Sequence, residues 1–262
     1  MNRYQILIEY VGTNFRGWQI QKKGPTIQGL IQEKLSKLLK EKIILHGQGR
    51  TDAGVHALGQ VFDFETSVKR TPEDWLNGLN SNLPKTIAIT SIQEVEPNFH
   101  SRFSAKERFY SYVIYNAKTK PLFFDDYVHW ENMPLDLEVM NDAAQQLIGK
   151  HDFSSFRSSS CGSKNPIKDI KTISLEQNST FIIMNISATA FLHNMVRIIA
   201  GTLISISKGE LTMTMTELLE AKDRNLAGKT VSAKGLFFLG PRYDKSTGIK
   251  SPYSNLKSKF NL

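Results

Sequence analysis

The chain has 262 residues, and its 33 Lys and Arg against 25 Asp and Glu give a formal net charge of +8. Hydrophobic residues at 40% and charged residues at 22% are typical of a globular protein and exclude a disordered chain. A single cysteine, Cys161, excludes an internal disulfide framework and a zinc site built on paired cysteines. No apolar stretch approaches the roughly 18 residues of a membrane-spanning helix. We therefore expect a cytoplasmic protein without signal peptide or membrane contact.

The basic surplus favours a polyanionic partner, and nucleic acid is the commonest one. Charge alone does not decide the matter, since many basic proteins bind no nucleic acid.

In the first half, strands alternate with two amphipathic helices. Alternating β-rich residues predict strands at 4–10, 43–46, 60–64 and 87–95. A helix is expected from its N-cap Thr26 to Lys42, because apolar residues recur there with a helical period. Thr71 and Pro72 open a second helix, since proline is favoured in the first turn.

The second half repeats this order. We expect a strand at 109–115, a helix at 137–148 ended by Gly149, and a hairpin of 170–175 with 181–186 that turns near Asn178 and Ser179. A long helix is expected at 190–206, and a shorter one at 214–222 opened by Thr216.

The repeated order predicts an α+β protein. Its two similar halves should contribute antiparallel strands to one continuous mixed sheet, with helices on one side. We place an N-terminal half at residues 1–103, a C-terminal half at 104–245 and a basic tail at 246–262.

A glycine-rich stretch at 47–60, GQGRTDAGVHALGQ, is the densest chemical signal. Glycines let the backbone turn sharply and approach a ligand closely. From spacing alone, Asp52 has three interpretations: a cap of a following helix, a metal ligand, or a nucleophile or base. The phosphate-loop pattern ending in Gly-Lys-Ser/Thr is absent. The metal interpretation is weak, because His46 and His56 lie ten residues apart and the stretch has no second acidic ligand.

The run GRTDAGVHALGQV resembles the signature of the TruA-type tRNA pseudouridine synthases. Further ordered resemblances extend from about Tyr4 to about Tyr243, at residues 10–19, 99–105, 151–163, 190–197 and 233–236. The last of these resembles the last strand of the family. The sequence departs from common family residues at Phe109, Asn194 and Ser232, none of which is a matched catalytic residue.

This resemblance implies an RNA-modifying isomerase that acts in tRNA processing. Members convert uridine to pseudouridine at positions thirty-eight to forty of the tRNA anticodon stem-loop, without metal or organic cofactor, as homodimers. The resemblance implies that Asp52 is the catalytic nucleophile, that Arg197 contacts it, and that Tyr110 lines the uracil pocket. A slip in the match would select Tyr112 instead of Tyr110.

Other residues of the glycine-rich stretch are expected to bind the substrate. Arg50 is expected to contact phosphate or support the flipped nucleotide, and we place Thr51 and His56 beside it as substrate-binding residues.

The chemistry explains why a carboxylate is needed. Cleavage of the bond from uracil to ribose builds oxocarbenium-like charge on the sugar, which an ionised aspartate can stabilise or attack. The same aspartate can instead remove a ribose proton to give a glycal, and the sequence leaves both routes open.

Two other functions compete with this interpretation. One is a non-catalytic structured-RNA-binding protein with the same basic face. The other is a metal-dependent phosphoryl-transfer enzyme or nuclease, which we disfavour because Asp63 and Glu65 lie on an alternating strand without further acidic residues around them.

Overall fold

A computed structural model describes residues 1–247 and 255–256, so most of the expected tail at 246–262 lies outside the described residues. The chain divides into two compact units, one of residues 1–106 with 237–262 and one of residues 107–236. The boundary after Lys106 lies close to the predicted division after residue 103. The sequence predicts that residues 237–245 belong to the C-terminal half, but they pack with the N-terminal unit.

The first unit is built on a sheet with the strand order β4-β1-β3-β10, and β2 pairs with β3. β1 is antiparallel to both β3 and β4, whereas β10 runs parallel to β3. The strands are β1 (Asn2–Tyr10), β2 (His46–Gly47), β3 (His56–Thr66), β4 (Ile87–Val95) and β10 (Leu236–Arg242).

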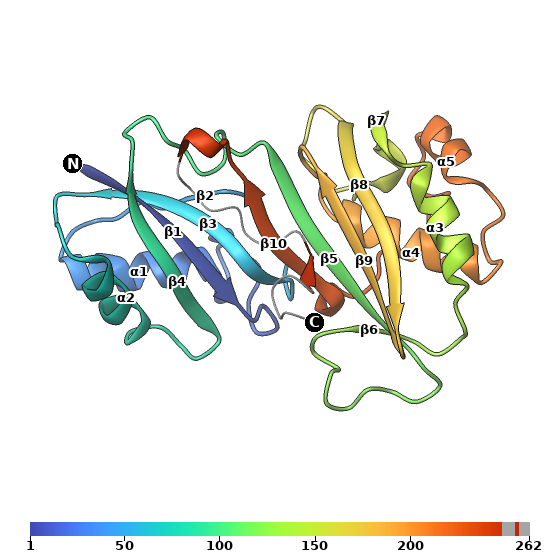
Figure 1. The fold of residues 1–262 in the computed structure, drawn as a ribbon, viewed down its shortest axis with the longest axis horizontal. Coiled ribbons are helices and arrows are strands. Elements are labelled where there is room, and N and C mark those ends of the chain that lie inside the picture. The colour runs from blue at the N-terminus through green and yellow to red at the C-terminus, as the bar shows by residue number, and fades with distance from the viewer. Residues whose placement is uncertain (248–254, 257–262) are drawn as a thin grey trace. The chain divides into compact units, whose positions relative to one another are not determined.

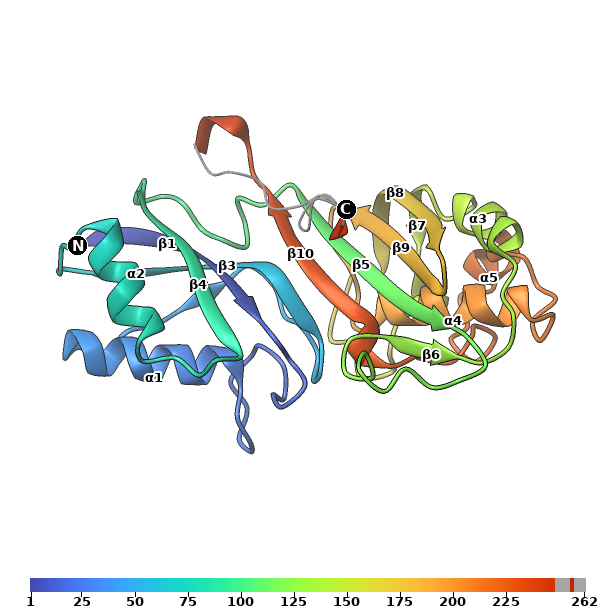
Figure 2. The ribbon, with the colours of Figure 1, turned by 60° about the horizontal axis from the view of Figure 1, so that its bottom comes forward.

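Two helices cover one face of this sheet, α1 (Ile27–Leu39) and α2 (Pro72–Asn80) (Figures 1 and 2). Thr26 and Thr71 cap their N-termini, as predicted, because each side-chain oxygen accepts a backbone N–H of the first turn. Trp75 of α2 packs its ring against Tyr4 of β1 and Phe64 of β3, with centroids 5.3 and 5.9 Å apart. These aromatic contacts join the helical layer to the sheet.

The second unit contains a sheet with the order β5-β9-β8-β7, and β6 runs parallel to β5. β8 and β9 form the predicted hairpin, and Ser179 in its turn has a positive φ of 55°. The strands are β5 (Glu107–Asn116), β6 (His129–Glu131), β7 (Gly149–Asp152), β8 (Ile167–Asn178) and β9 (Phe181–Ala188).

Three helices complete the second unit: α3 (Leu137–Gln145), α4 (Met195–Ser207) and α5 (Met215–Ala221). α3 packs against α4 and β8, and α4 also packs against β5. Parallel and antiparallel pairs occur together with helices, so the predicted α+β class with mixed pairing is confirmed. None of the helices among the described residues is long and apolar enough to cross a membrane.

Several predicted boundaries were wrong for local reasons. Residues 43–45 are not a strand, because the N–H groups of Ile43 and Leu45 bond to side chains of α1. α4 begins only at Met195, since Asn194 before it adopts a left-handed conformation with φ of 62°. Thr214, not Thr216, caps α5 in a capping box with Glu217. A 3-10 turn at Ala233–Gly235 precedes β10, and β7 was not predicted.

Candidate active-site elements

The glycine-rich stretch connects β2 to β3 in the first unit and is braced by residues 12–18. A Cβ on Gly12 would lie 2.0 Å from the Val55 carbonyl oxygen, and one on Gly17 would lie 2.4 Å from the Thr51 carbonyl oxygen. Gly17 also has a φ of 84°, which favours glycine. The backbone N–H of Trp18 donates to the Thr51 carbonyl at 3.1 Å. Two separate sequence motifs therefore form one packed substructure.

A buried polar contact fixes the centre of the stretch. The hydroxyls of Thr51 and Tyr10 are hydrogen-bonded at 2.7 Å, and both residues are buried. Burial raises the pKa of the Tyr10 hydroxyl far above its usual range, although its hydrogen bonds to Thr51 and Gln60 act in the opposite direction. Gln60 also donates to the Gly49 carbonyl at 3.1 Å. A neutral, immobile hydroxyl thus holds the backbone beside Asp52.

Asp52 is partly buried in a tight turn, where its carbonyl accepts the Val55 N–H at 3.2 Å. The next regular element is β3, so the interpretation of Asp52 as a helix cap is wrong. Arg50 is exposed, and its Nε donates to Gln19 Oε1 at 3.1 Å. A partly buried aspartate and an exposed arginine therefore flank Thr51.

His56 lies at the start of β3 with almost no exposed surface. Its Nδ1 accepts the Gly12 N–H at 3.2 Å, so a ring proton is on Nε2. The ring also stacks on Phe237, with centroids 4.9 Å apart. These contacts place His56 in the support of the stretch.

Two candidate tyrosines lie on β5 of the second unit, where they differ in exposure. Tyr112 is fully buried, and its hydroxyl donates to the Ser232 carbonyl at 2.8 Å. Burial raises the pKa of Tyr112 well above its usual value, an effect that the charge of Arg197 opposes. Tyr110 is only partly buried and packs edge-on against Phe191 at 5.1 Å. Tyr110 is therefore the tyrosine with a partly accessible ring.

Arg197 lies in the first turn of α4, also in the second unit. Its Nε donates to the Val231 carbonyl at 2.8 Å, and its Nη1 donates to Asn194 Oδ1 at 3.1 Å. Asn194, where the sequence departs from the resembled family, thus anchors the arginine. The guanidinium is fixed in orientation before any ligand binds.

The predicted site residues fall into two groups. Arg50, Thr51, Asp52 and His56 lie together in the first unit, whereas Tyr110 and Arg197 belong to the second. Within residues 1–247 and 255–256, no cluster of three or more His, Cys, Asp or Glu side chains could hold a metal ion.

Three residues that lie in the stretch or contact it were not predicted as part of the site. Tyr10 and Gln60 hold Thr51 and Gly49, but an alternating strand sequence gives no sign of such a bond. Gln48 is 2% exposed, and neither of its amide atoms has a hydrogen-bond partner in the described structure. A buried amide without hydrogen bonds lowers the stability of the folded chain, and the sequence pattern does not predict that Gln48 is buried.

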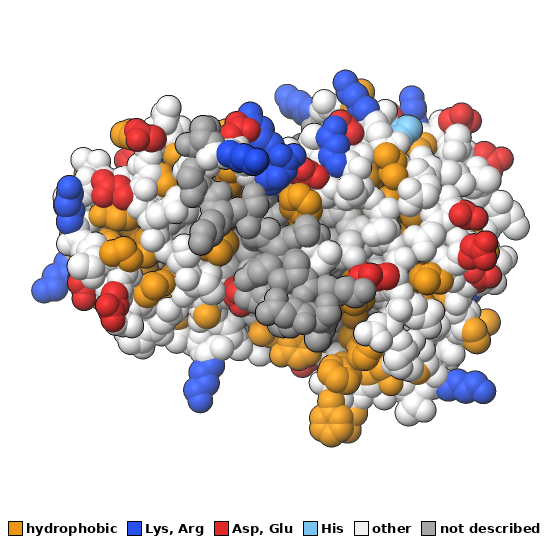
Figure 3. All heavy atoms as spheres, viewed as in Figure 1, with side chains coloured by type: hydrophobic (Ala, Val, Ile, Leu, Met, Phe, Trp, Pro, Cys, Tyr) orange, Lys and Arg blue, Asp and Glu red, His pale blue; other side chains and the backbone are white. Residues whose placement is uncertain are grey.

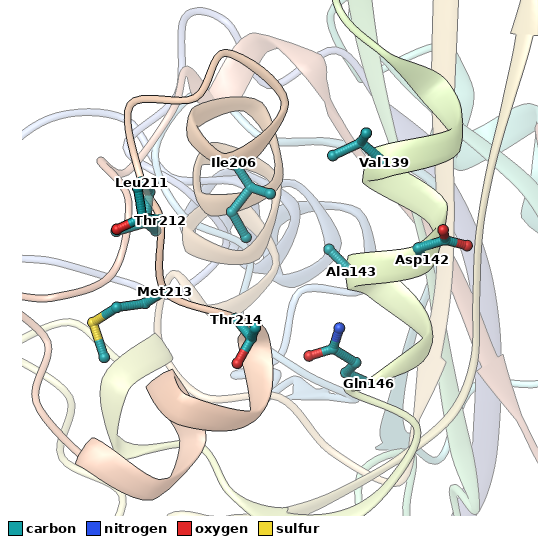
Figure 4. A pocket seen from close by; sticks show the side chains of 9 residues that line it. All are labelled: Val139, Asp142, Ala143, Gln146, Ile206, Leu211, Thr212, Met213 and Thr214. Carbon is teal, nitrogen blue, oxygen red and sulfur yellow. The ribbon is translucent and has the colours of Figure 1, made fainter.

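The second unit also contains a hollow of about 250 Å³ (Figure 4). Its walls come from α3, α4 and the segment leading into α5, and they include Val139, Ala143, Ile206 and Leu211. None of the predicted site residues lines it, and Asp142 is its one titratable side chain.

The sequence model of the tRNA pseudouridine synthase family matches residues 6–104 and 143–244. The chain belongs to this family. A tRNA pseudouridine synthase A of Francisella tularensis subsp. novicida (strain U112) is 41% identical over 244 residues, covering 93% of this chain and 95% of the relative. One of Dechloromonas aromatica (strain RCB) is 41% identical over 251 residues, covering 95% and 96%. The resemblance seen in the sequence, and with it the expectation of an enzyme of this class, is confirmed.

A solved Cbf5-Nop10-Gar1 complex contains a chain that is 9% identical to this one, with a TM-score of 0.33. The match covers 89% of this chain and 57% of the other, and the likeness is too weak to support a conclusion.

Proposed function

We propose that this chain isomerises uridine to pseudouridine at positions thirty-eight to forty of the tRNA anticodon stem-loop, with Asp52 as the nucleophile. The observation that carries the proposal is the support around Asp52, where Gly12, Gly17 and Tyr10 hold the GRTDAG turn through backbone contacts and a buried hydrogen bond. Such rigid placement is what attack on a sugar carbon requires. The net charge of +8 suits a tRNA substrate, and we expect the reaction to occur in the cytoplasm.

In the proposed reaction, the target nucleotide leaves the stacked loop at a cost of a few kcal/mol. Tyr110 then stacks on the uracil, which returns about 1–3 kcal/mol. The carboxylate of Asp52 either bonds to the anomeric carbon or removes a ribose proton, while the bond to the uracil nitrogen breaks. The base rotates and its ring carbon bonds to the anomeric carbon, which breaks the bond to Asp52 in the first route; in the second route, the abstracted proton returns from Asp52 to the ribose. The ring carbon then loses its proton, and the freed uracil nitrogen gains one.

The remaining predicted residues have supporting roles in this proposal. Arg197 stabilises the negative charge of the Asp52 carboxylate, and Arg50 contacts an RNA phosphate. His56 and Thr51 are buried and bonded within the protein, so we now assign them to positioning the turn.

The test is Asp52→Asn, which keeps the shape of the side chain and removes its charge. We expect pseudouridine formation to fall by at least roughly a thousandfold, while the Kd for an unmodified tRNA transcript stays within about threefold. If the chain were a non-catalytic RNA-binding protein, the parent protein itself would bind tRNA without forming pseudouridine. Activity that disappears in excess chelator would favour the metal-dependent alternative.

We also propose that the enzyme is a homodimer that associates through the loop between β5 and β6. Leu122 and Phe123 in this loop are 81% and 88% exposed, and Tyr127, Trp130 and Met133 nearby are also exposed. Figure 3 shows apolar side chains gathered over this loop, at the lower edge of the view. Such clusters are uncommon on surfaces that stay in water.

A further inference from the structure

The segment from Phe99 to Ser104 lies within one of the motifs that resemble the family, and none of its residues has a role in the proposed reaction. It places a row of aromatic and basic side chains on the surface of the first unit. The ring centroids of His46 and His100 are 5.4 Å apart, and those of His100 and Phe103 are 4.4 Å apart. Arg102 Cζ lies 5.7 Å from the centre of the Phe103 ring. Phe103 is nevertheless 75% exposed.

This row rests on a rigid foundation. The Ser101 N–H donates to Oδ1 of the fully buried Asp63 at 2.8 Å, and the Tyr243 hydroxyl donates to the Ser101 carbonyl at 2.9 Å. Arg3 holds Asp63 Oδ2 at 3.3 Å. Ser101 Oγ is buried without a hydrogen-bond partner among the described residues. The exposure of Phe103 is therefore not the result of a loosely held segment.

The orientation of His100 is also fixed. Its Nδ1 accepts the backbone N–H of Arg102 at 3.1 Å, so a ring proton is on Nε2. The row thus offers an aromatic face, a guanidinium and an imidazole N–H within one short segment. A nucleobase stacks on aromatic faces, and arginine pairs with its phosphate, so this combination suits an unpaired nucleotide.

The position of the row separates it from the proposed reaction. His46 pairs with Asp63 on β3, and the GRTDAG turn leads into the same strand at His56. At about 3.3 Å per residue, the row lies roughly 20 Å along β3 from that turn. A nucleotide bound here belongs to the same RNA but is not the one that reacts.

We propose that His46, His100, Arg102 and Phe103 form a second RNA subsite, in which an unpaired base of the substrate stacks on Phe103 and its phosphate pairs with Arg102. The identity of the RNA as tRNA rests on the proposed function.

The test measures the Kd for an unmodified tRNA transcript in an Asp52→Asn background, so that no turnover intervenes. Phe103→Ala and Phe103→Leu should each weaken binding about tenfold (about 1.4 kcal/mol), because both remove the aromatic face. Phe103→Trp should bind like the parent, and added RNA should quench its fluorescence beyond the quenching of the parent's own tryptophans. Leu226→Ala, at an exposed apolar residue of the second unit, is the control and should leave Kd unchanged.

Unchanged binding by Phe103→Ala, or Phe103→Leu binding like the parent, would overturn the subsite. A changed mass in light scattering with unchanged RNA affinity would overturn it in favour of a protein contact. Activity of the parent protein on tRNA is measured in parallel. An active parent with unaltered Phe103→Ala binding rejects the subsite alone, whereas an inactive parent rejects the proposed function.

Discussion

Thr51 fixes the backbone next to Asp52 through its hydrogen bond to the buried Tyr10 hydroxyl. Thr51→Val keeps the shape of the side chain but leaves this hydroxyl one partner short, at a cost of about 1–3 kcal/mol. We expect a lower melting temperature and a kcat reduced roughly ten- to a hundredfold, since small misplacements are costly in catalysis. Thr212→Val, at an exposed threonine, should change neither quantity. Unaltered kcat in Thr51→Val would show that this bond does not position Asp52.

Gly17 is required by both conformation and space. Gly17→Ala places a Cβ 2.4 Å from the Thr51 carbonyl oxygen at a φ of 84°, so we expect a loss of at least about 1 kcal/mol of stability and most of the activity. Gly49 in the same stretch has no atom within 4 Å of its Cβ position. Gly49→Ala should therefore melt like the parent. Equal melting temperatures for the two variants would contradict this description of the turn.

At the scale of elements, β6 contains a histidine that links stability to pH. Burial lowers the pKa of His129, an effect that Glu131 opposes and Lys208 reinforces. The unfolded chain, with a histidine pKa of about 6.5, binds the proton more readily, so stability falls as pH decreases below that value. The stability that neutral His129 contributes is fully present above the unfolded-state pKa and is lost as pH falls toward and through the lowered folded-state pKa.

His129→Gln removes this titration. We expect the melting temperature of the parent to fall more steeply than that of the variant between pH 7.5 and pH 5.5, a window on the order of one unit around the unfolded value. Parallel curves for the two proteins would exclude His129 as a source of the pH dependence.

Elements whose signals are local were predictable from the sequence. Thr26 and Thr71 cap their helices, and alternation located β4 and the β8–β9 hairpin, because these features depend on neighbouring residues. The start of α4 was not predictable, since an apolar run does not reveal that Asn194 turns left-handed before it. β10 was grouped with the wrong unit because its parallel pairing with β3 joins segments far apart in the chain.

The candidate site was predictable to a similar degree. The GRTDAG run led to the prediction of Asp52 and its neighbours as site residues, because a contiguous motif can be recognised in a sequence, and their catalytic and binding roles stay predictions. It did not reveal that Tyr10 and Gln60 support the stretch, or that His56 is committed to Gly12 and Phe237. These contacts join distant strands and leave no periodic signal.

At the scale of the whole molecule, the exposed β5–β6 loop predicts an association of two chains. Phe123→Asp places a charge on a residue that is 88% exposed, so the single chain should tolerate it while an apolar interface should not. Light scattering should give twice the chain mass for the parent and the single-chain mass for the variant. Ile44→Asp, at an exposed residue of the first unit, should leave the dimer intact. A parent with the single-chain mass at working concentration would contradict the homodimer.

The most direct test of the proposed function is to incubate the purified protein with an unmodified tRNA transcript and map pseudouridine at single-nucleotide resolution. We predict new pseudouridine at one or more of positions thirty-eight to forty with the parent protein, and none with Asp52→Asn. Modification confined to another part of the tRNA, or equal modification by Asp52→Asn, would contradict the account.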